Sequence, residues 1–255
     1  DGPEELTHTA FVAEETIRFL REHRDEEKPF FCIAGIFAPH CPINPPSRFV
    51  DLYNLEDMPL PVRLEDENFQ NVTDAQWRKI KAYYYALISH IDDQVGRILH
   101  ELKKSGLDQD TLVIFTSDHG EKFQSGKNFQ DIVEAVDIVP TILDACGIEK
   151  PSYLQGKSLF PLLQGTTSQT DRDSAFIEFK VPFKRSYKAL RTKDYLYVAN
   201  GDGREELYDL IQDPDQLRDI SNRKESASAL DQMRRSLITR ILENESHHPL
   251  KTAEY

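Results

Sequence analysis

Apolar residues recur at helical spacing near the start of the chain and are followed by an unbroken apolar run. Between Leu6 and Arg24 they return at every third or fourth position, the period of a helix with one buried face. Lys28-Pro29 ends this helix, and Phe30–Phe37 is then apolar along its whole length. Such a run is typical of a parallel strand buried on both faces. The pattern therefore predicts a helix followed by a buried strand.

The same order, helix and then buried strand, returns later in the chain. Thr73 or Asp74 begins a long amphipathic helix that Ser105-Gly106 ends, and Thr111–Thr116 is a second apolar run rich in β-branched residues. A further helix is predicted over Asp131–Cys146. Alternating helices and buried strands predict an α/β fold, in which helices flank a mostly parallel sheet.

The character of the sequence changes beyond residue 165. Short β-branched and aromatic runs alternate with turn residues such as Gly201-Asp202-Gly203, which is the signature of an antiparallel meander. Ala227–Asn244 is an amphipathic helix suited to cover one face of that small sheet. We therefore expect part of an α/β domain over residues 1–165 and an α+β subdomain over residues 166–255. The predicted strands are Ala175–Phe179, Lys188–Thr192, Tyr195–Asn200 and Glu206–Leu210.

The composition indicates a globular protein and restricts its partners. Hydrophobic residues make up 39% of the 255 positions, which is enough apolar surface to form a core. The formal net charge of -13 argues against nucleic-acid binding, because phosphate contacts need a basic surface. No apolar stretch approaches the roughly 20 residues that span a bilayer, so no membrane span is predicted. An anionic substrate would need a local cationic site, such as a metal ion.

Polar side chains follow both predicted buried strands, at the sheet edge where ligand sites of such folds form. His40 follows the first strand, and Asp118-His119 follows the second. A carboxylate beside an imidazole can bind a divalent cation through oxygen and nitrogen, while Pro39 and Pro42 restrict the backbone around His40. Structural alternatives remain open here: Asp118 as the cap of the following turn, and both histidines as ordinary loop residues.

Lys127 is a further candidate for a binding residue. It follows Gly126 on a loop, where its ammonium group could bind an anion. An isolated lysine is more often a solvated surface charge, and its spacing from the other candidates does not decide between the two interpretations.

Several longer stretches are informative in combination. They are Lys28-Pro-Phe-Phe31 with Ala38-Pro-His-Cys-Pro42, the helical Tyr84–Arg97, Thr116-Ser-Asp-His-Gly-Glu121, Asp137–Gly147, and Leu190–Tyr195 with Glu206–Pro214. In this order they resemble the sulfatase family of the alkaline phosphatase superfamily, and the resemblance extends over nearly the whole chain. It implies an alkaline-phosphatase-like sheet flanked by helices, followed by a small carboxyl-terminal sheet domain.

The resemblance implies a role for each candidate residue. Asp118 and His119 would be two ligands of a divalent cation, usually calcium and sometimes magnesium or manganese, which neutralises the sulfate oxygens. His40 would contact the sulfate or assist the leaving oxygen. Lys127 would bridge the sulfate and the nucleophile, with Lys122 as its rival because the loop between them is shorter than is usual in the family.

Two departures from the family pattern stand out. Family members carry an Asp-Asp metal pair and a Cys or Ser that is oxidised to formylglycine, the nucleophile, within a C/S-x-P-x-R motif. Cys32, Cys41 and Cys146 all lack that context. A second gap falls at Gln130-Asp131, where the family has a further strand and loop. We therefore expect this chain to be the carboxyl-terminal part of a larger enzyme, with the formylglycine outside it, and to be inactive alone.

The resemblance implies a sulfuric ester hydrolase that acts on a small-molecule or carbohydrate sulfate ester. A phosphomonoester or phosphonate monoester hydrolase of the same superfamily is an alternative, because it shares the metal-binding loop. A non-catalytic remnant is a second alternative, because the nucleophile is absent from this chain. The sequence alone does not decide among these three.

Overall fold

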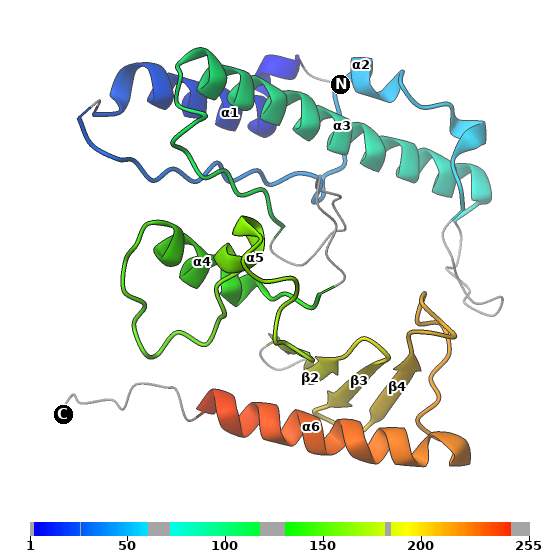
Figure 1. The fold of residues 1–255 in the computed structure, drawn as a ribbon. Coiled ribbons are helices and arrows are strands. Elements are labelled where there is room, and N and C mark those ends of the chain that lie inside the picture. Colours follow the sequence, from blue (N-terminus) through cyan, green and yellow to red (C-terminus); the bar gives the residue numbers. More distant parts are fainter. Residues whose placement is uncertain (1–2, 26, 61–71, 118–130, 182–184, 246–255) are drawn as a thin grey trace, which may run out of the picture. The chain divides into compact units, whose positions relative to one another are not determined.

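The computed structural model describes residues 3–25, 27–60, 72–117, 131–181 and 185–245. The chain forms two compact units, Asp1–Val113 and Ile114–Tyr255. Figure 1 shows their elements, and each unit is treated by itself below. The predicted division at residues 165 and 166 separates catalytic domain from subdomain and stays a prediction.

The first helix of unit 1 forms as predicted. A short 3-10 turn, η1 (Glu4–Leu6), leads into α1 (His8–Arg18), which continues as a π-helical segment, η2 (Phe19–His23). The hydroxyl of Thr7 accepts a hydrogen bond from the backbone N–H of Ala10 and so caps α1.

The long helix of unit 1 is α3 (Asp74–Lys104), and it packs against α1. Thr73 and Gln76 form a capping box at its start. At its end, Gly106 has a φ of +67°, a conformation that L-residues with a side chain rarely adopt. The sequence therefore predicted both ends of this helix. Shorter elements of the unit are α2 (Ser47–Val50) and η3 (Leu55–Asp57).

The buried face of α3 differs in part from the apolar stripe that its sequence predicts. Ile80 and Leu99, expected to be buried, are 41% and 44% exposed. His90, Gln94 and Glu101 are buried instead. Gln94 and Glu101 bond to Glu4 and Arg21, which belong to other elements and which the helical period does not reveal.

The predicted parallel sheet is not present in the described residues. Phe30–Phe37 and Thr111–Thr116 are extended but form no strand pairs, and most of their side chains are exposed. Phe31 is 69% exposed and Ile33 is 78% exposed, so the prediction that this run is buried on both faces is wrong for this structure. A strand must hydrogen-bond to neighbours, and no described segment pairs with either run.

Unit 2 begins with a helix shorter than predicted. A 3-10 turn, η4 (Ala135–Asp137), leads into α4 (Ile138–Ala145), followed by α5 (Phe160–Gln164). Residues 131–134 are not helical, because Glu134 and Asp137 form a capping box that starts the helix later. The buried face also differs: Val136 and Val139 are about half exposed, whereas Asp137, Pro140 and Thr141 are buried.

The carboxylate of Asp137 joins segments of unit 2 that lie far apart in sequence. It accepts hydrogen bonds from the backbone N–H of Glu134 and of Lys157, both at 2.8 Å, and from Arg172 Nη2 at 2.5 Å. Glu134 pairs with Arg172 and also accepts hydrogen bonds from Arg240 and from the N–H of Phe176. We call Glu134, Asp137, Arg172 and Arg240 the buried ion cluster.

A close backbone approach accompanies this cluster at Gly156. A Cβ atom at this position would collide with the carbonyl group of Val136. Glycine therefore allows the chain to pass close enough for Lys157 N–H to reach Asp137.

The carboxyl-terminal sheet forms as the sequence predicts. Its four strands pair antiparallel in the order β1-β2-β3-β4. In the middle of the sheet, Leu190 on β2 lies opposite both Phe176 on β1 and Tyr197 on β3. The strands are β1 (Ala175–Val181), β2 (Arg185–Arg191), β3 (Tyr195–Asn200) and β4 (Glu205–Asp209).

Helix α6 (Ala227–Glu245) covers one face of this sheet, as Figure 1 shows in red and orange. It is preceded by a 3-10 turn, η5 (Lys224–Ser226). Among the helices of the described ranges, none has a stretch long and apolar enough to cross a lipid bilayer. The core between helix and sheet consists of Leu190, Tyr197, Leu207, Leu230, Met233 and Leu237.

Replacing Leu237 with Ala should lower the free energy of unfolding by about 2–5 kcal/mol, because it leaves a cavity between α6 and the sheet. Leu237 is 4% exposed. The control is Leu242→Ala on the same helix, where the side chain is 60% exposed and the expected change is within about 0.5 kcal/mol. Urea unfolding followed by circular dichroism measures both. Equal effects would contradict the packing of α6 on the sheet.

Candidate functional site

His40 is the one predicted site residue that lies within the described ranges. It stands in the loop after Phe37, where its backbone N–H donates to the Phe37 carbonyl at 3.3 Å and its ring lies 4.6 Å from the Phe37 ring. Its Nδ1 is 2.8 Å from the carbonyl oxygen of Cys41. A carbonyl can only accept, so Nδ1 carries the hydrogen and, in a neutral ring, Nε2 is left as a proton acceptor. The side chain is exposed.

The predicted metal ligands, Asp118 and His119, lie outside the described residues, as do Lys127 and its rival Lys122. The structure therefore does not test how these side chains lie relative to His40. Within the described ranges, no three His, Cys, Asp or Glu side chains come together in a way that could hold a metal ion.

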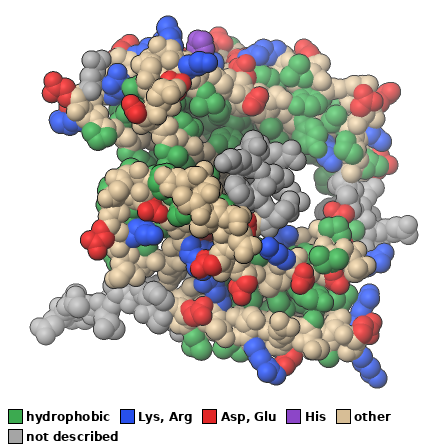
Figure 2. All heavy atoms as spheres, viewed as in Figure 1, with side chains coloured by type: hydrophobic (Ala, Val, Ile, Leu, Met, Phe, Trp, Pro, Cys, Tyr) green, Lys and Arg blue, Asp and Glu red, His purple; other side chains and the backbone are tan. Residues whose placement is uncertain are grey.

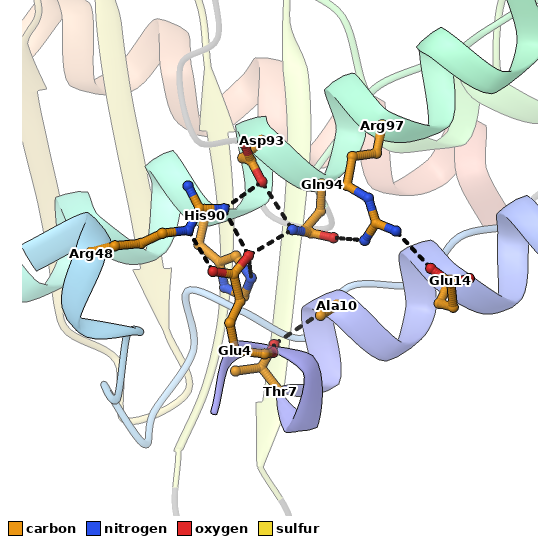
Figure 3. Close-up of polar contacts among 9 residues, drawn as sticks. All are labelled: Glu4, Thr7, Ala10, Glu14, Arg48, His90, Asp93, Gln94 and Arg97. Carbon is orange, nitrogen blue, oxygen red and sulfur yellow. Dashed lines mark hydrogen bonds and ion pairs between the residues drawn. The ribbon is translucent and has the colours of Figure 1, made fainter. Parts of the chain in front are cut away.

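A group of charged side chains from η1, α2 and α3 lies together within unit 1 (Figure 3). Arg48, at the start of α2, donates from Nη2 to Glu4 Oε1 and to Asp93 Oδ2, both at 2.8 Å. Its guanidinium group also lies over the ring of Phe49, 3.9 Å from the centroid. We call Glu4, Arg48 and Asp93 the Arg48 cluster. It connects η1, α2 and α3 by charge-assisted hydrogen bonds.

Gln94 and Arg97 extend this group toward α1. Gln94 Nε2 donates to Glu4 Oε1 at 3.2 Å, and Arg97 Nη1 donates to Gln94 Oε1 at 2.7 Å. Arg97 then pairs with Glu14 at 2.6 Å. The buried amide of Gln94 is thus satisfied at both its nitrogen and its oxygen.

His90 is buried beside this group, with 1% of its surface exposed. Its ring is 4.9 Å from the ring of Phe49, and its Nε2 is 3.9 Å from Glu4 Oε1 without a hydrogen-bond partner. Burial lowers the pKa of His90, with the guanidinium of Arg48 adding to the effect against the opposing carboxylates. The hydrogen bond from Arg48 lowers the pKa of Glu4. At neutral pH an uncharged imidazole therefore lies beside an ionised carboxylate.

Sequence reasoning did not find this group. Glu4 and Gln94 are 90 positions apart, and each member looks like an ordinary surface residue in its own helix. The available signal was the conflict between His90 and the apolar stripe around it, since a buried polar position needs a partner from elsewhere.

The comparison with protein families decides what kind of chain this is. A sulfatase model matches residues 3–134, and a model of the carboxyl-terminal domain of N-sulphoglucosamine sulphohydrolase matches residues 107–243. The chain belongs to the sulfatase family. The first match includes all four predicted site residues, His40, Asp118, His119 and Lys127.

Individual sulfatase-type proteins agree with this assignment. An arylsulfatase of Clostridium perfringens is 31% identical over 94% of this chain and 59% of its own length. A phosphonate monoester hydrolase of Agrobacterium radiobacter has a similar structure, with a TM-score of 0.82, 25% identity, and coverage of 95% of this chain and 62% of that one.

A second similar structure was solved in complex with its substrate, D-glucosamine-2-N,6-O-disulfate. It has a TM-score of 0.72 and 20% identity, and covers 96% of this chain and 71% of that one. This likeness concerns the fold alone. The chain thus spans little more than half of the arylsulfatase that it matches.

The surface of this sulfatase chain bears both signs of charge. Figure 2 shows Asp and Glu side chains interspersed with Lys and Arg over the visible face. Among the described residues on that face, the acidic side chains are therefore dispersed and not gathered in one patch. This is compatible with the prediction that an anionic ester would need a local cationic site.

The free energy of unfolding should fall as the pH is lowered below about 6.5, in part through His90. Because its pKa is lower in the folded state, the unfolded chain binds a proton first as the pH falls. This contribution to stability is complete above the unfolded pKa and is lost as the pH falls through the folded pKa. His90→Gln should flatten the pH dependence between about pH 5 and 7, as measured by urea unfolding.

The control for this measurement is His100→Gln, in the same helix but exposed to solvent. It should retain the wild-type slope between the same pH values. A slope unchanged in His90→Gln would show that the burial of His90 does not contribute to the pH dependence of stability.

Proposed function

We propose that this chain is part of a sulfuric ester hydrolase. The observation that supports this most strongly is the sulfatase model match over residues 3–134, which contains every predicted site residue. The 31% identity to an arylsulfatase over 94% of the chain supports the same reaction class. In this proposal, residues 1–165 belong to the catalytic domain and residues 166–255 form the carboxyl-terminal subdomain.

Asp118 and His119 would hold a divalent cation, with calcium favoured and magnesium or manganese as alternatives. Their carboxylate oxygen and imidazole nitrogen are donor types that such cations accept. When bound, the cation supplies positive charge to the sulfate oxygens. This matters in a chain with a formal net charge of -13, because the average field of the protein repels an anionic substrate. The nucleophile would be a formylglycine outside this chain.

His40 would act next to the leaving oxygen of the ester. Its Nδ1 is engaged by the Cys41 carbonyl, which fixes the ring orientation and leaves Nε2 for a proton or an oxygen of the substrate. Lys127, or Lys122 in its place, would bind the sulfate as a compact positive charge. The proposed substrate is a small-molecule or carbohydrate sulfate ester; the disulfated glucosamine bound by the second similar structure is an example of the carbohydrate class.

A phosphonate or phosphate monoester hydrolase is the second candidate. It is favoured by the phosphonate monoester hydrolase whose structure matches 95% of this chain with a TM-score of 0.82. Both reactions need a cation that binds a charged tetrahedral group, so the residues named above suit either one. A non-catalytic remnant is the third candidate, and it predicts no turnover of any ester.

The full-length gene product should hydrolyse an aryl sulfate faster than the matching aryl phosphate or phenylphosphonate ester. His40→Gln should lower kcat/KM for the preferred ester by about 10²–10⁴-fold, because the variant cannot exchange a proton. The control is His100→Gln, an exposed histidine that is expected to leave the rate unchanged. A preference for the phosphonate would support the second candidate, and no turnover of the three esters would support the third.

Asp118→Ala should lower kcat/KM by at least about 10²-fold, because loss of the cation removes several kcal/mol of charge stabilisation. EDTA should have the same effect on the wild type, and added calcium should restore its activity. The control is Asp110→Ala, an exposed aspartate before the same apolar run. Wild-type activity that survives EDTA together with a fully active Asp118→Ala variant would exclude a role for the cation.

A further inference from the structure

The loop that carries His40 ends at α2, and α2 is held by buried contacts. Pro45 and Pro46 are buried at the end of the loop, and Phe49 is buried within α2. Arg48, between them in sequence, is bound to Glu4 of η1 and to Asp93 of α3. The position of the loop end is therefore set by the contacts that hold Phe49 and Arg48.

The ring of Phe49 in turn contacts the imidazole of His90. Phe49 contacts both His90 and Arg48. Its ring centroid lies 4.9 Å from that of His90 and 3.9 Å from the guanidinium carbon of Arg48. Figure 3 shows His90 close to the Glu4 carboxylate that also binds Arg48. One carboxylate thus lies beside two potential cations.

His90 is buried, unlike the exposed His40, and its Nε2 has no hydrogen-bond partner. Such an atom is costly to bury, and a proton placed on it would find Glu4 Oε1 at 3.9 Å as its acceptor. The charged groups facing His90 are Glu4 from η1, Arg48 from α2 and Asp93 from α3 itself. A charge on His90 would therefore attract both carboxylates and repel Arg48.

We propose that His90 is a positioning residue, which sets the place of the His40 loop through Phe49 and the Arg48 cluster and shifts that place when it binds a proton. The protonated ring competes with Arg48 for Glu4, so α2 loses one of the two carboxylates that hold it. The loop that begins at Phe37 and ends at α2 then moves relative to α3. This inference rests on the proposed role of His40.

The two histidines can be followed separately by NMR in the full-length protein labelled at histidine nitrogens, between pH 5 and 8. His40→Gln and His90→Gln identify the two sets of imidazole resonances by their disappearance. In the wild type, the His40 resonances should show a second inflection at the pH where His90 titrates. In His90→Gln that inflection should be lost.

Arg48→Ala tests the route between the two residues. The Arg48 side chain is 54% exposed, so this variant is expected to fold. His90 should still titrate in it, but the second inflection of His40 should be lost. A matched control is Arg78→Ala, an arginine of α3 bound to the backbone of Glu56 and outside the Arg48 cluster. That variant should keep the inflection.

The proposal is overturned if the wild-type His40 resonances follow a single titration curve. It is also overturned if the second inflection persists in His90→Gln or in Arg48→Ala. His90→Phe, which keeps a ring in contact with Phe49 but cannot bind a proton, serves if His90→Gln does not fold.

None of these measurements requires turnover. Failure of the proposed function would appear as absent ester hydrolysis with the coupled titrations intact. Failure of this inference would appear as uncoupled titrations in an active hydrolase. If the enzyme is active, the acidic limb of its pH–rate profile should shift in His90→Gln, which a purely structural role of His90 would not cause.

Discussion

Asp137 has no exposed surface, and the polar atoms around it must therefore find their partners within the protein. Its carboxylate accepts hydrogen bonds from the start of its own helix, from the backbone of Lys157 and from the guanidinium of Arg172, which also pairs with Glu134. Through Arg240, Glu134 extends the connection to α6. A buried charge left without its partner is strongly destabilising, so these contacts stabilise the packing of the joined segments of unit 2.

Unit 1 obeys the same constraint with a different result. On the buried face of α3, Gln94 bonds to Glu4 and Arg97, and Glu101 bonds to Arg21. These partners come from η1, η2 and α3, and Arg48 of α2 binds Glu4 in turn. Nε2 of the buried His90 has no hydrogen-bond partner. The contact to α2 matters most, because the loop with His40 ends there. The packing of α3 therefore affects the position of His40, the residue proposed to act on the substrate.

The sequence predicted elements whose formation depends on local patterns. Both ends of α3, the four-stranded meander and the cover of α6 follow from periodicity, caps and turn residues. It did not predict which residues are buried around Asp137 and His90, because partners distant in sequence decide that. The parallel sheet was inferred from two apolar runs, and pairing depends on neighbours that a run does not specify. Of the predicted site, the described residues include His40 alone.

The two extended apolar runs have a consequence for how this chain behaves in solution. Phe30–Phe37 and Thr111–Thr116 present strand-length backbone and apolar side chains without a pairing partner among the described residues, the kind of segment that adds to strands of other molecules. The formal net charge of -13 opposes such association by repulsion between molecules. Wherever these two runs are left unpaired, acid or high salt weakens that repulsion and so favours association through them.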